Sequence, residues 1–377
     1  MKKVLLAGTA LVATALIASP AQAELKLDLG GHFSGYAAFI DEDDDALAAP
    51  GSDDMLIRRN TEIHFTGETT LDNGLTVGVH VEQEIENANM NNESYAYFSG
   101  GWGRVNFGNE DGVAYLLQVA APSADSNIDG LRSTVQAFTY DGAGSAVVAP
   151  AAAGTYATLD YDLAHFGNAP TDGVTNPTDR ISYLTPKFNG FQAGASYAPR
   201  AELATGILNG AAAVSGFEDL WEVAARWDGE FEGVGISVGA GYATSDNNTA
   251  GGAEPEGWNV GFNLAWNQFS FGGAWVDEED AYGSAGTEHT TWVLGAAWDN
   301  GPYHVGVSYL DKEDENIFAA GDSFDSNKLT VGGGYTFGPG MTFRGAVAFG
   351  EALNNGATSA NAEADFTQVT IGTDIQF

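Results

Sequence analysis

Arginine and histidine side chains fall at alternate positions along several stretches of the chain, opposite apolar residues. Around Ile63 and Phe65, the intervening positions hold Arg58, Asn60, Glu62 and His64. Successive side chains of a β-strand point to opposite faces, so these four polar residues are expected to share one face. The same parity selects a further set: His32, Tyr36, Arg104, Asn106, Arg180, Arg226 and Arg344. Where such charges line an aqueous passage, they control which ions pass.

Two other patterns suggest different chemistry. The acidic run at residues 41–45 contains Asp41, Asp43 and Asp45, and hard cations such as Ca²⁺ bind several carboxylates. No glycine follows these acids at EF-hand spacing, so a solvated loop that attracts cations is the simpler interpretation. The G-x-S-x-G pattern at residues 235–239 lies within an alternating stretch rather than at a strand-to-helix turn, which argues against a nucleophile. We therefore expect no enzyme activity and no cofactor, with Ca²⁺ at the acidic run as the one candidate ion.

The composition is strongly acidic, and the first residues indicate export. The chain has 14 Lys and Arg against 51 Asp and Glu, and no Cys. A nucleic-acid partner would need a basic face, and disulfides or thiolate metal sites would need cysteine. Residues 1–23 combine two lysines, an apolar run and a small-x-small end, which is typical of a cleaved signal peptide. The expected mature chain is one domain over residues 24–377, with a net charge of −39 because the signal carries only the two lysines.

The elements that must position these charges are predicted to be β-strands. Apolar residues alternate with polar ones over about nine or ten residues, and aromatic residues such as Trp258 and Trp266 lie at the ends. Transmembrane strands have this length and carry aromatic residues at both membrane interfaces. The pattern predicts sixteen strands, at residues 25–40, 56–70, 75–86, 93–99, 103–108, 178–185, 190–198, 219–229, 234–244, 257–266, 269–277, 288–298, 303–310, 326–337, 341–350 and 364–377. An all-β, antiparallel transmembrane barrel of sixteen strands is wide enough to enclose an aqueous channel.

The connections alternate between short turns and longer acidic or polar loops, as in outer-membrane barrels. Residues 109–177 break this rhythm, because they contain no clean order of strand and hairpin. A loop of that length is uncommon in a compact domain, so we expect this third loop to fold into the lumen. A short helix is predicted within residues 113–119. An extra hairpin at residues 155–163 is an alternative that would change the strand count.

Residues 94–108 (SYAYFSGGWGRVNFG) resemble the hairpin that precedes the third loop in the general porins of Gram-negative bacteria, closest to the alphaproteobacterial group. The stripe that ends at Phe377 resembles the signal that outer-membrane barrels present to the barrel assembly machinery. This resemblance covers nearly all of the mature chain. It implies a homotrimer in the outer membrane, in contact with lipid and lipopolysaccharide, whose third loop narrows the pore.

The resemblance also implies a transverse field at the constriction. We assign its basic side to Arg58 and Arg104, and its acidic side to residues after the hairpin: Glu110, Asp111, Asp125 and Asp129. Arg180, Arg226, Arg344, His32 and His64 are further candidates for the pore wall. For each of these residues the alternative is an ordinary wall residue that pairs with a nearby acid.

The function expected from these observations is passive diffusion of ions and small hydrophilic solutes through a water-filled channel, with a mild preference for cations. A substrate-specific channel for sugars or small organic acids is the first alternative. A soluble secreted β-sandwich or adhesin is the second, although the even strand count and the terminal phenylalanine argue against it.

Overall fold

The computed structural model describes residues 25–43, 55–85, 91–124, 178–200, 217–280, 285–316, 321–355 and 362–377. These residues form sixteen strands and one short helix, α1 (Val113–Leu116). The strands are β1 (Lys26–Asp43), β2 (Met55–Thr70), β3 (Thr76–Glu84), β4 (Asn91–Gly100), β5 (Gly103–Glu110), β6 (Thr178–Leu184), β7 (Phe191–Arg200), β8 (Phe217–Phe231), β9 (Val234–Asn247), β10 (Glu256–Trp266), β11 (Phe269–Glu279), β12 (Glu288–Asn300), β13 (Tyr303–Glu315), β14 (Ser323–Gly338), β15 (Met341–Asn355) and β16 (Ala362–Gln376).

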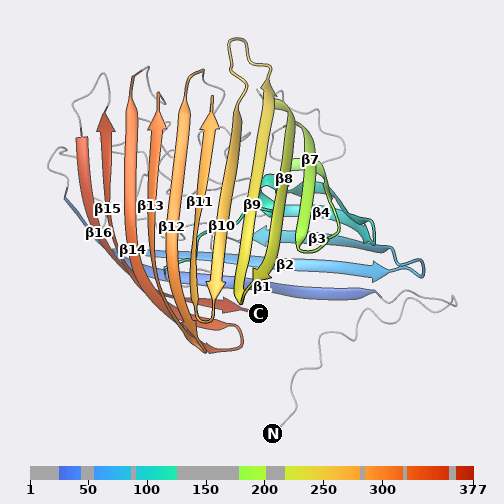
Figure 1. Cartoon of the computed structure of the whole chain (residues 1–377), viewed down its shortest axis with the longest axis horizontal. Helices are drawn as coiled ribbons and strands as arrows, with labels where there is room; N and C mark the ends of the chain where they lie inside the picture. The colour runs from blue at the N-terminus through green and yellow to red at the C-terminus, as the bar shows by residue number, and fades with distance from the viewer. Residues whose placement is uncertain are drawn as a thin grey trace, which may run out of the picture.

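The strands close into a single antiparallel barrel (Figure 1). Each strand pairs with its neighbours in sequence, and β1 also pairs with β16, so that Tyr36 lies opposite both Gly372 and Arg58. Closure leaves no sheet edge and satisfies the backbone hydrogen bonds within the barrel, which a spanning structure requires in lipid. The sixteen predicted strands are therefore confirmed, and the alternative of a soluble β-sandwich is wrong.

Several strands extend beyond the predicted stretches at their loop ends. Strand β1 reaches Asp43, and β14 begins at Ser323, before the apolar stripe starts. The reason is that ladder hydrogen bonds involve the backbone and continue where the side chains become polar. The stripe of apolar residues predicts the part of a strand that faces lipid, whereas pairing with a neighbour decides the strand's full length.

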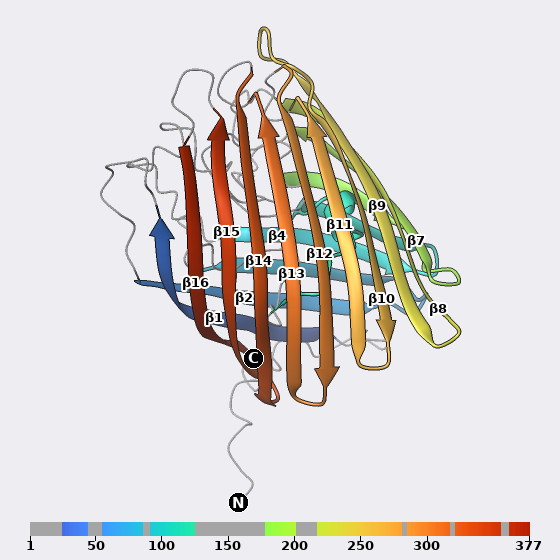
Figure 2. The same cartoon turned by 60° about the vertical axis from the view of Figure 1, so that its left-hand side comes forward.

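The two rims of the barrel differ in their connections (Figure 2). Short turns such as residues 267–268 and 301–302 join strands at one rim, and β9 and β10 are joined by the longer residues 248–255 at the other. The chain end lies at the short-turn rim, where the amide of Phe377 donates to Gly31 O at 3.1 Å. Short turns of outer-membrane barrels face the periplasm, which orients this barrel.

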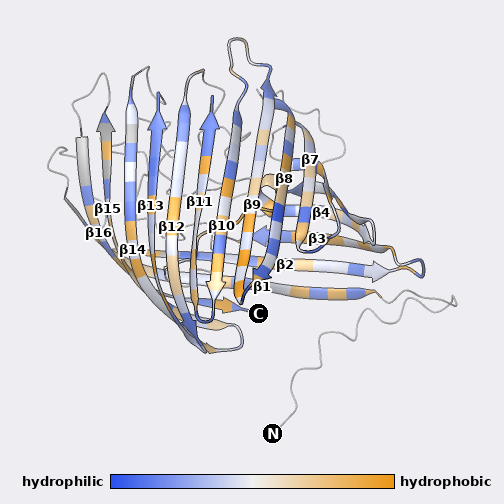
Figure 3. Cartoon of the chain, viewed as in Figure 1, coloured by the Kyte–Doolittle hydropathy of each residue, from blue (hydrophilic) through white to orange (hydrophobic). Residues whose placement is uncertain are grey.

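Hydropathy alternates along the strands (Figure 3). Many large apolar side chains are exposed on the outer face. Outward side chains such as Ile57 and Phe107 are exposed. Exposed aromatic residues lie toward both rims, with Trp102, Phe188, Trp266, Tyr303 and Phe337 toward the short turns and Trp221, Tyr242 and Trp258 toward the long loops. Lipid-facing barrels carry such aromatic girdles at both interfaces. Among the described residues, no helix is both long enough and apolar enough to cross a bilayer.

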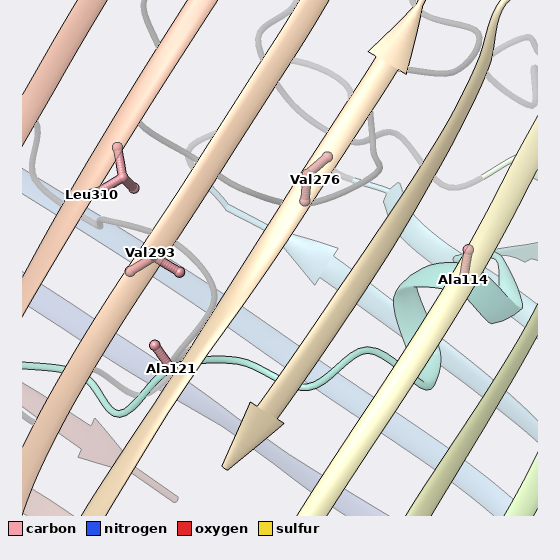
Figure 4. Close-up of a cluster of buried hydrophobic side chains, with 5 residues drawn as sticks. All are labelled: Ala114, Ala121, Val276, Val293 and Leu310. Atoms are coloured by element: carbon pink, nitrogen blue, oxygen red, sulfur yellow. The ribbon is translucent and has the colours of Figure 1, made fainter.

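A buried core lies inside the barrel, where residues 112–124 contact the inner wall. Ala114 and Ala121 pack with Val276, Val293 and Leu310 of the wall (Figure 4). The predicted helix within residues 113–119 is formed only at Val113–Leu116. Beyond Leu116, the amide of Gln118 donates to Tyr115 O, while Ala114 O accepts a hydrogen bond from the wall residue Asn259. Residues 1–24 and 125–177, including the signal peptide and the alternative hairpin at 155–163, lie outside the described residues.

Candidate functional site: the inner wall of the barrel

Inward-facing glycines form a track for residues 112–124 along the inner wall. A Cβ atom at Gly306 would lie 2.6 Å from Ser123 O, and one at Gly239 would lie 2.8 Å from Leu117 O. Similar overlap with this segment would occur at Gly194, Gly261 and Gly295, and tight contacts of 3.0 and 3.1 Å would occur at Gly241 and Gly272. Real Cβ atoms do not approach other heavy atoms more closely than 3.0 Å. The absence of side chains on this track, which runs from β7 to β13, therefore lets the segment lie directly against the strand backbone.

Polar wall side chains hold the backbone carbonyls of the same segment. Asn259 Nδ2 donates to Ala114 O at 3.1 Å, and Arg226 Nη1 donates to Gln118 O at 3.2 Å. Further along, His304 Nε2 lies 3.0 Å from Ser123 O. Buried carbonyls outside regular structure need such donors. The segment is thus fixed to the wall by shape and by hydrogen bonds, and sequence reasoning missed this arrangement.

Arg180 and Glu222 form a buried ion pair on the inner face, beneath the start of α1. Arg180 Nη1 contacts Glu222 Oε1, and Arg180 Nε donates to Thr178 O at 3.3 Å. The other oxygen of Glu222 accepts the amide of Ala114 at 3.0 Å. A Cβ atom at Gly112 would overlap the Glu222 carboxylate, so the observed position of that carboxylate depends on glycine here. The charge of Arg180 is therefore neutralised where it anchors the helix.

Arg226 and Arg344 also face inward and also have carboxylate partners. Arg226 Nη2 lies 2.9 Å from Asp228 Oδ1. Arg344 Nη1 lies 3.2 Å from Asp374 Oδ2, and its guanidinium carbon lies 4.5 Å from the ring centre of Tyr36. Arg226 lies on β8, Arg344 on β15 and Arg180 on β6, so the structure does not gather these three residues into one cluster.

Arg104 of β5 lies over aromatic side chains, and its charge also acts on Glu110. Its guanidinium carbon is 4.1 Å from the ring centre of Tyr97, and its Nε donates to Asn106 Oδ1 at 2.6 Å. Glu110, at the end of the same strand, is buried, and Asp111 follows it directly. Arg104 and Glu110 thus belong to one strand, and their role in a constriction stays a prediction.

The remaining predicted site residues are only partly within the described structure. The backbone of Arg58 pairs with Tyr36, but its side chain lies outside the described part. Asp125 and Asp129 lie outside it, as do Asp45 and the side chain of Asp43. Asp41 is exposed at the long-loop end of β1. The proposed Ca²⁺ site and the acidic side of the constriction therefore stay predictions.

Four glutamates form a patch on the inner wall at β2–β4, and sequence reasoning identified only one of them. Glu62 lies opposite Glu84, and Glu82 lies opposite both His64 and Glu93. We call Glu62, Glu82, Glu84 and Glu93 the acidic patch. The sequence signal was the matching parity of these residues, but bringing them level with one another requires the strand register that the turn at residues 71–75 sets.

A closed barrel with an apolar exterior, a charged interior and a segment against its inner wall defines a channel-forming protein of the bacterial outer membrane. This chain belongs to the Gram-negative porin family, whose model matches residues 7–374. It is therefore an outer-membrane diffusion channel. A search of curated proteins finds no match.

Solved porin structures have the same fold. The anion-selective porin from Comamonas acidovorans is 17% identical, with a TM-score of 0.59, and the alignment covers 94% of this chain and 100% of that one. The trimer form of OmpT from Vibrio cholerae is 13% identical, with a TM-score of 0.58 and coverage of 94% and 99%. A porin refined at 1.8 Å resolution is 15% identical, with a TM-score of 0.58 and coverage of 93% and 100%. At these identities the likeness extends to the fold alone.

Proposed function

We propose that this channel is a homotrimer that passes ions and small hydrophilic solutes by diffusion and prefers cations. The acidic patch carries this proposal. It gathers four glutamates on one wall, whereas Arg180, Arg226 and Arg344 lie on three separate strands, each next to a carboxylate. Charge that lines a narrow aqueous passage sets its ion selectivity, so the patch should favour cations. The trimer is supported by family membership and by the trimer form of OmpT.

The third loop is proposed to form the constriction. Residues 112–124 already run along the wall from β7 to β13, and the loop continues from there toward Asp125 and Asp129. Acids on that loop would face Arg104 across the passage, which gives the transverse field. The Comamonas acidovorans porin is anion-selective. Its selectivity depends on its own wall charges, which 17% identity does not transfer to this chain.

Planar-bilayer recording of the purified protein tests both parts of this proposal. Ohmic conductance in groups of three equal steps is expected for a trimer of open channels. In a KCl gradient the reversal potential should have the sign of a cation-preferring pore, and this preference should weaken at high salt. The reason is that the Debye length falls from about 30 Å at 0.01 M to about 3 Å at 1 M.

A double variant identifies the source of the selectivity. Glu62→Gln with Glu84→Gln removes two facing carboxylates of the acidic patch and should move the reversal potential toward zero. The matched control is Glu232→Gln with Glu254→Gln, which removes two exposed carboxylates outside the strands and should change it little. Clear anion preference in the unmodified protein would overturn the proposal. An equal shift in both double variants would contradict the assignment to the patch.

A further inference from the structure

Three histidines gather on the inner wall near the short-turn rim, next to the acidic patch. They are His32 on β1, His64 on β2 and His80 on β3, and they make up half of the six histidines in the chain. The ring centres of His32 and His64 are 6.2 Å apart, and those of His64 and His80 are 5.6 Å apart. Neither diffusion nor ion selectivity requires this grouping of imidazoles.

Two of the imidazoles direct a nitrogen at the same carboxylate oxygen. His64 Nδ1 lies 3.4 Å from Glu82 Oε2, and His80 Nε2 lies 3.7 Å from that oxygen. The donor atoms of His64, His80 and Glu82 all lie within 4.8 Å of one another. Ligand atoms around a tetrahedral zinc ion, at bond lengths of about 2.0–2.2 Å, are roughly 3.3–3.6 Å apart. Closing the set around an ion therefore needs shifts of about 1 Å or less, which side-chain rotation can provide.

In both His64 and His80, the ring nitrogen that points away from Glu82 contacts a neighbouring polar group. His64 Nε2 lies 3.2 Å from Glu62 Oε2, a carboxylate that can only accept a hydrogen when it is ionised. His80 Nδ1 lies 2.8 Å from the hydroxyl of Thr66. A ring that donates through these nitrogens presents an unprotonated Nδ1 of His64 and Nε2 of His80 toward Glu82. Metal-binding histidines are commonly oriented in this way by a carboxylate or another acceptor on the far nitrogen.

The group is accessible from the lumen and carries negative charge. The side chains of His64, His80 and Glu82 are 33%, 18% and 13% exposed. A cavity of about 420 Å³ is lined by His32, His64 and His80 together with Phe377 at the short-turn rim. An ion can therefore enter from the periplasmic side, and water has room to complete its coordination. Glu84, which lies opposite Glu62, is a further acidic side chain beside the site.

We propose that His64, His80 and Glu82 bind one divalent transition-metal ion of the zinc class on the inner wall, with Glu62 and Thr66 orienting the two imidazoles. Two imidazoles and one carboxylate suit Zn²⁺, Ni²⁺ or Cu²⁺, whereas Mg²⁺ and Ca²⁺ prefer oxygen ligands alone. Three protein ligands leave a coordination position for water or for a ligating group on a passing solute. The competing explanation is a set of histidine–glutamate contacts that binds no ion. The proposal rests on the inner wall alone and does not depend on the direction of ion selectivity.

Calorimetric titration of the metal-free protein in detergent with ZnCl₂ is the direct test. One saturable site per chain is expected for Zn²⁺, and none for MgCl₂ at the same concentrations. His64→Asn and His80→Asn should each abolish that site, whereas His304→Asn, an inner-wall histidine on β13, should keep it. Glu62→Gln should weaken binding by about 10–100-fold through loss of the orienting carboxylate.

A spectroscopic measurement distinguishes binding at this site from nonspecific binding, because it reports how many nitrogen atoms ligate the ion. Electron paramagnetic resonance of Cu²⁺ bound at one equivalent should show two nitrogen ligands in the unmodified protein, and His80→Asn should lose this two-nitrogen signature. Heat-modifiable migration on gels checks that each variant is a folded barrel. The proposal is wrong if Zn²⁺ does not bind saturably. It is also wrong if His64→Asn and His80→Asn bind as the unmodified protein does, or if the copper spectrum of the folded protein shows no nitrogen ligand.

Discussion

Replacing Gly306 with alanine tests whether residues 112–124 lie on the glycine track as described. Gly306 faces inward on β13, and a Cβ atom there would lie 2.6 Å from Ser123 O, 2.8 Å from Ala124 O and 2.9 Å from Ala124 Cα. All three are backbone atoms, so no side-chain rotation can relieve the overlap. The segment must move away from the wall by about half an ångström or more. That movement also lengthens the contact of 3.0 Å between His304 Nε2 and Ser123 O.

The expected cost follows from these contacts. Overpacking of a tight interior costs about 1–3 kcal/mol, and a weakened hydrogen bond adds about 1 kcal/mol. Gly235→Ala is the matched control, because Gly235 also faces inward, and its Cβ atom would lie 3.6 Å from the Cβ of Ala265, an ordinary contact. A glycine-to-alanine change without strain stabilises a protein by about 0.4–1 kcal/mol through the unfolded state. The two substitutions should therefore change the free energy of unfolding in opposite directions.

Urea unfolding of the barrel in detergent, followed by tryptophan fluorescence, measures both variants on the same scale. Limited proteolysis adds a local measurement, since a segment lifted from the wall should be cut faster in Gly306→Ala than in Gly235→Ala. If Gly306→Ala is as stable and as resistant to protease as Gly235→Ala, the segment does not contact β13 and the account of the track is wrong.

Three further predictions concern the barrel wall. Glu222→Gln leaves Arg180 buried without its partner and should lower the free energy of unfolding by about 3–5 kcal/mol, whereas Asp228→Asn, at a half-exposed pair, should cost about 0–1 kcal/mol; equal urea midpoints would contradict this. Arg104→Gln removes a guanidinium from the wall and should raise the cation preference measured by reversal potential, so a shift toward anions would oppose it. Phe107→Arg, on the lipid face at mid-strand, should cost about 2–4 kcal/mol, but Phe188→Arg at the rim only about 0–1 kcal/mol, as urea unfolding in lipid bilayers would measure.

The strands could be predicted from sequence because each one carries its own signal. Alternation depends only on which face of a strand meets lipid, so stretches such as residues 257–266 predict β10 without knowledge of its neighbours. Side-chain parity follows in the same way, and it placed Arg180, Arg226 and Arg344 on the polar face. The pairing of β1 with β16 also follows from sequence, because a sheet in lipid must leave no strand edge without hydrogen-bond partners.

The site could not be predicted in the same way, because it depends on contacts between distant residues. Parity says which face Arg180 occupies but not that Glu222 lies beside it, 42 residues further along the chain. The histidine group needs the register that brings His64 level with Glu82. In the sequence, the inward glycines are indistinguishable from other small strand residues. Their role depends on residues 112–124, which lie against them on the inner wall.

The glycine track also sets an order of events during assembly. Residues 112–124 are synthesised before every strand that holds them, and the contact between Ser123 and His304 joins residues 181 positions apart in sequence. Contacts of such high order form slowly, because a long chain must close before they provide stabilisation. The segment cannot reach its final position until β13 is in the wall. If this segment forms the proposed constriction, the width of the passage is set late in folding, after more than half of the barrel has formed around it.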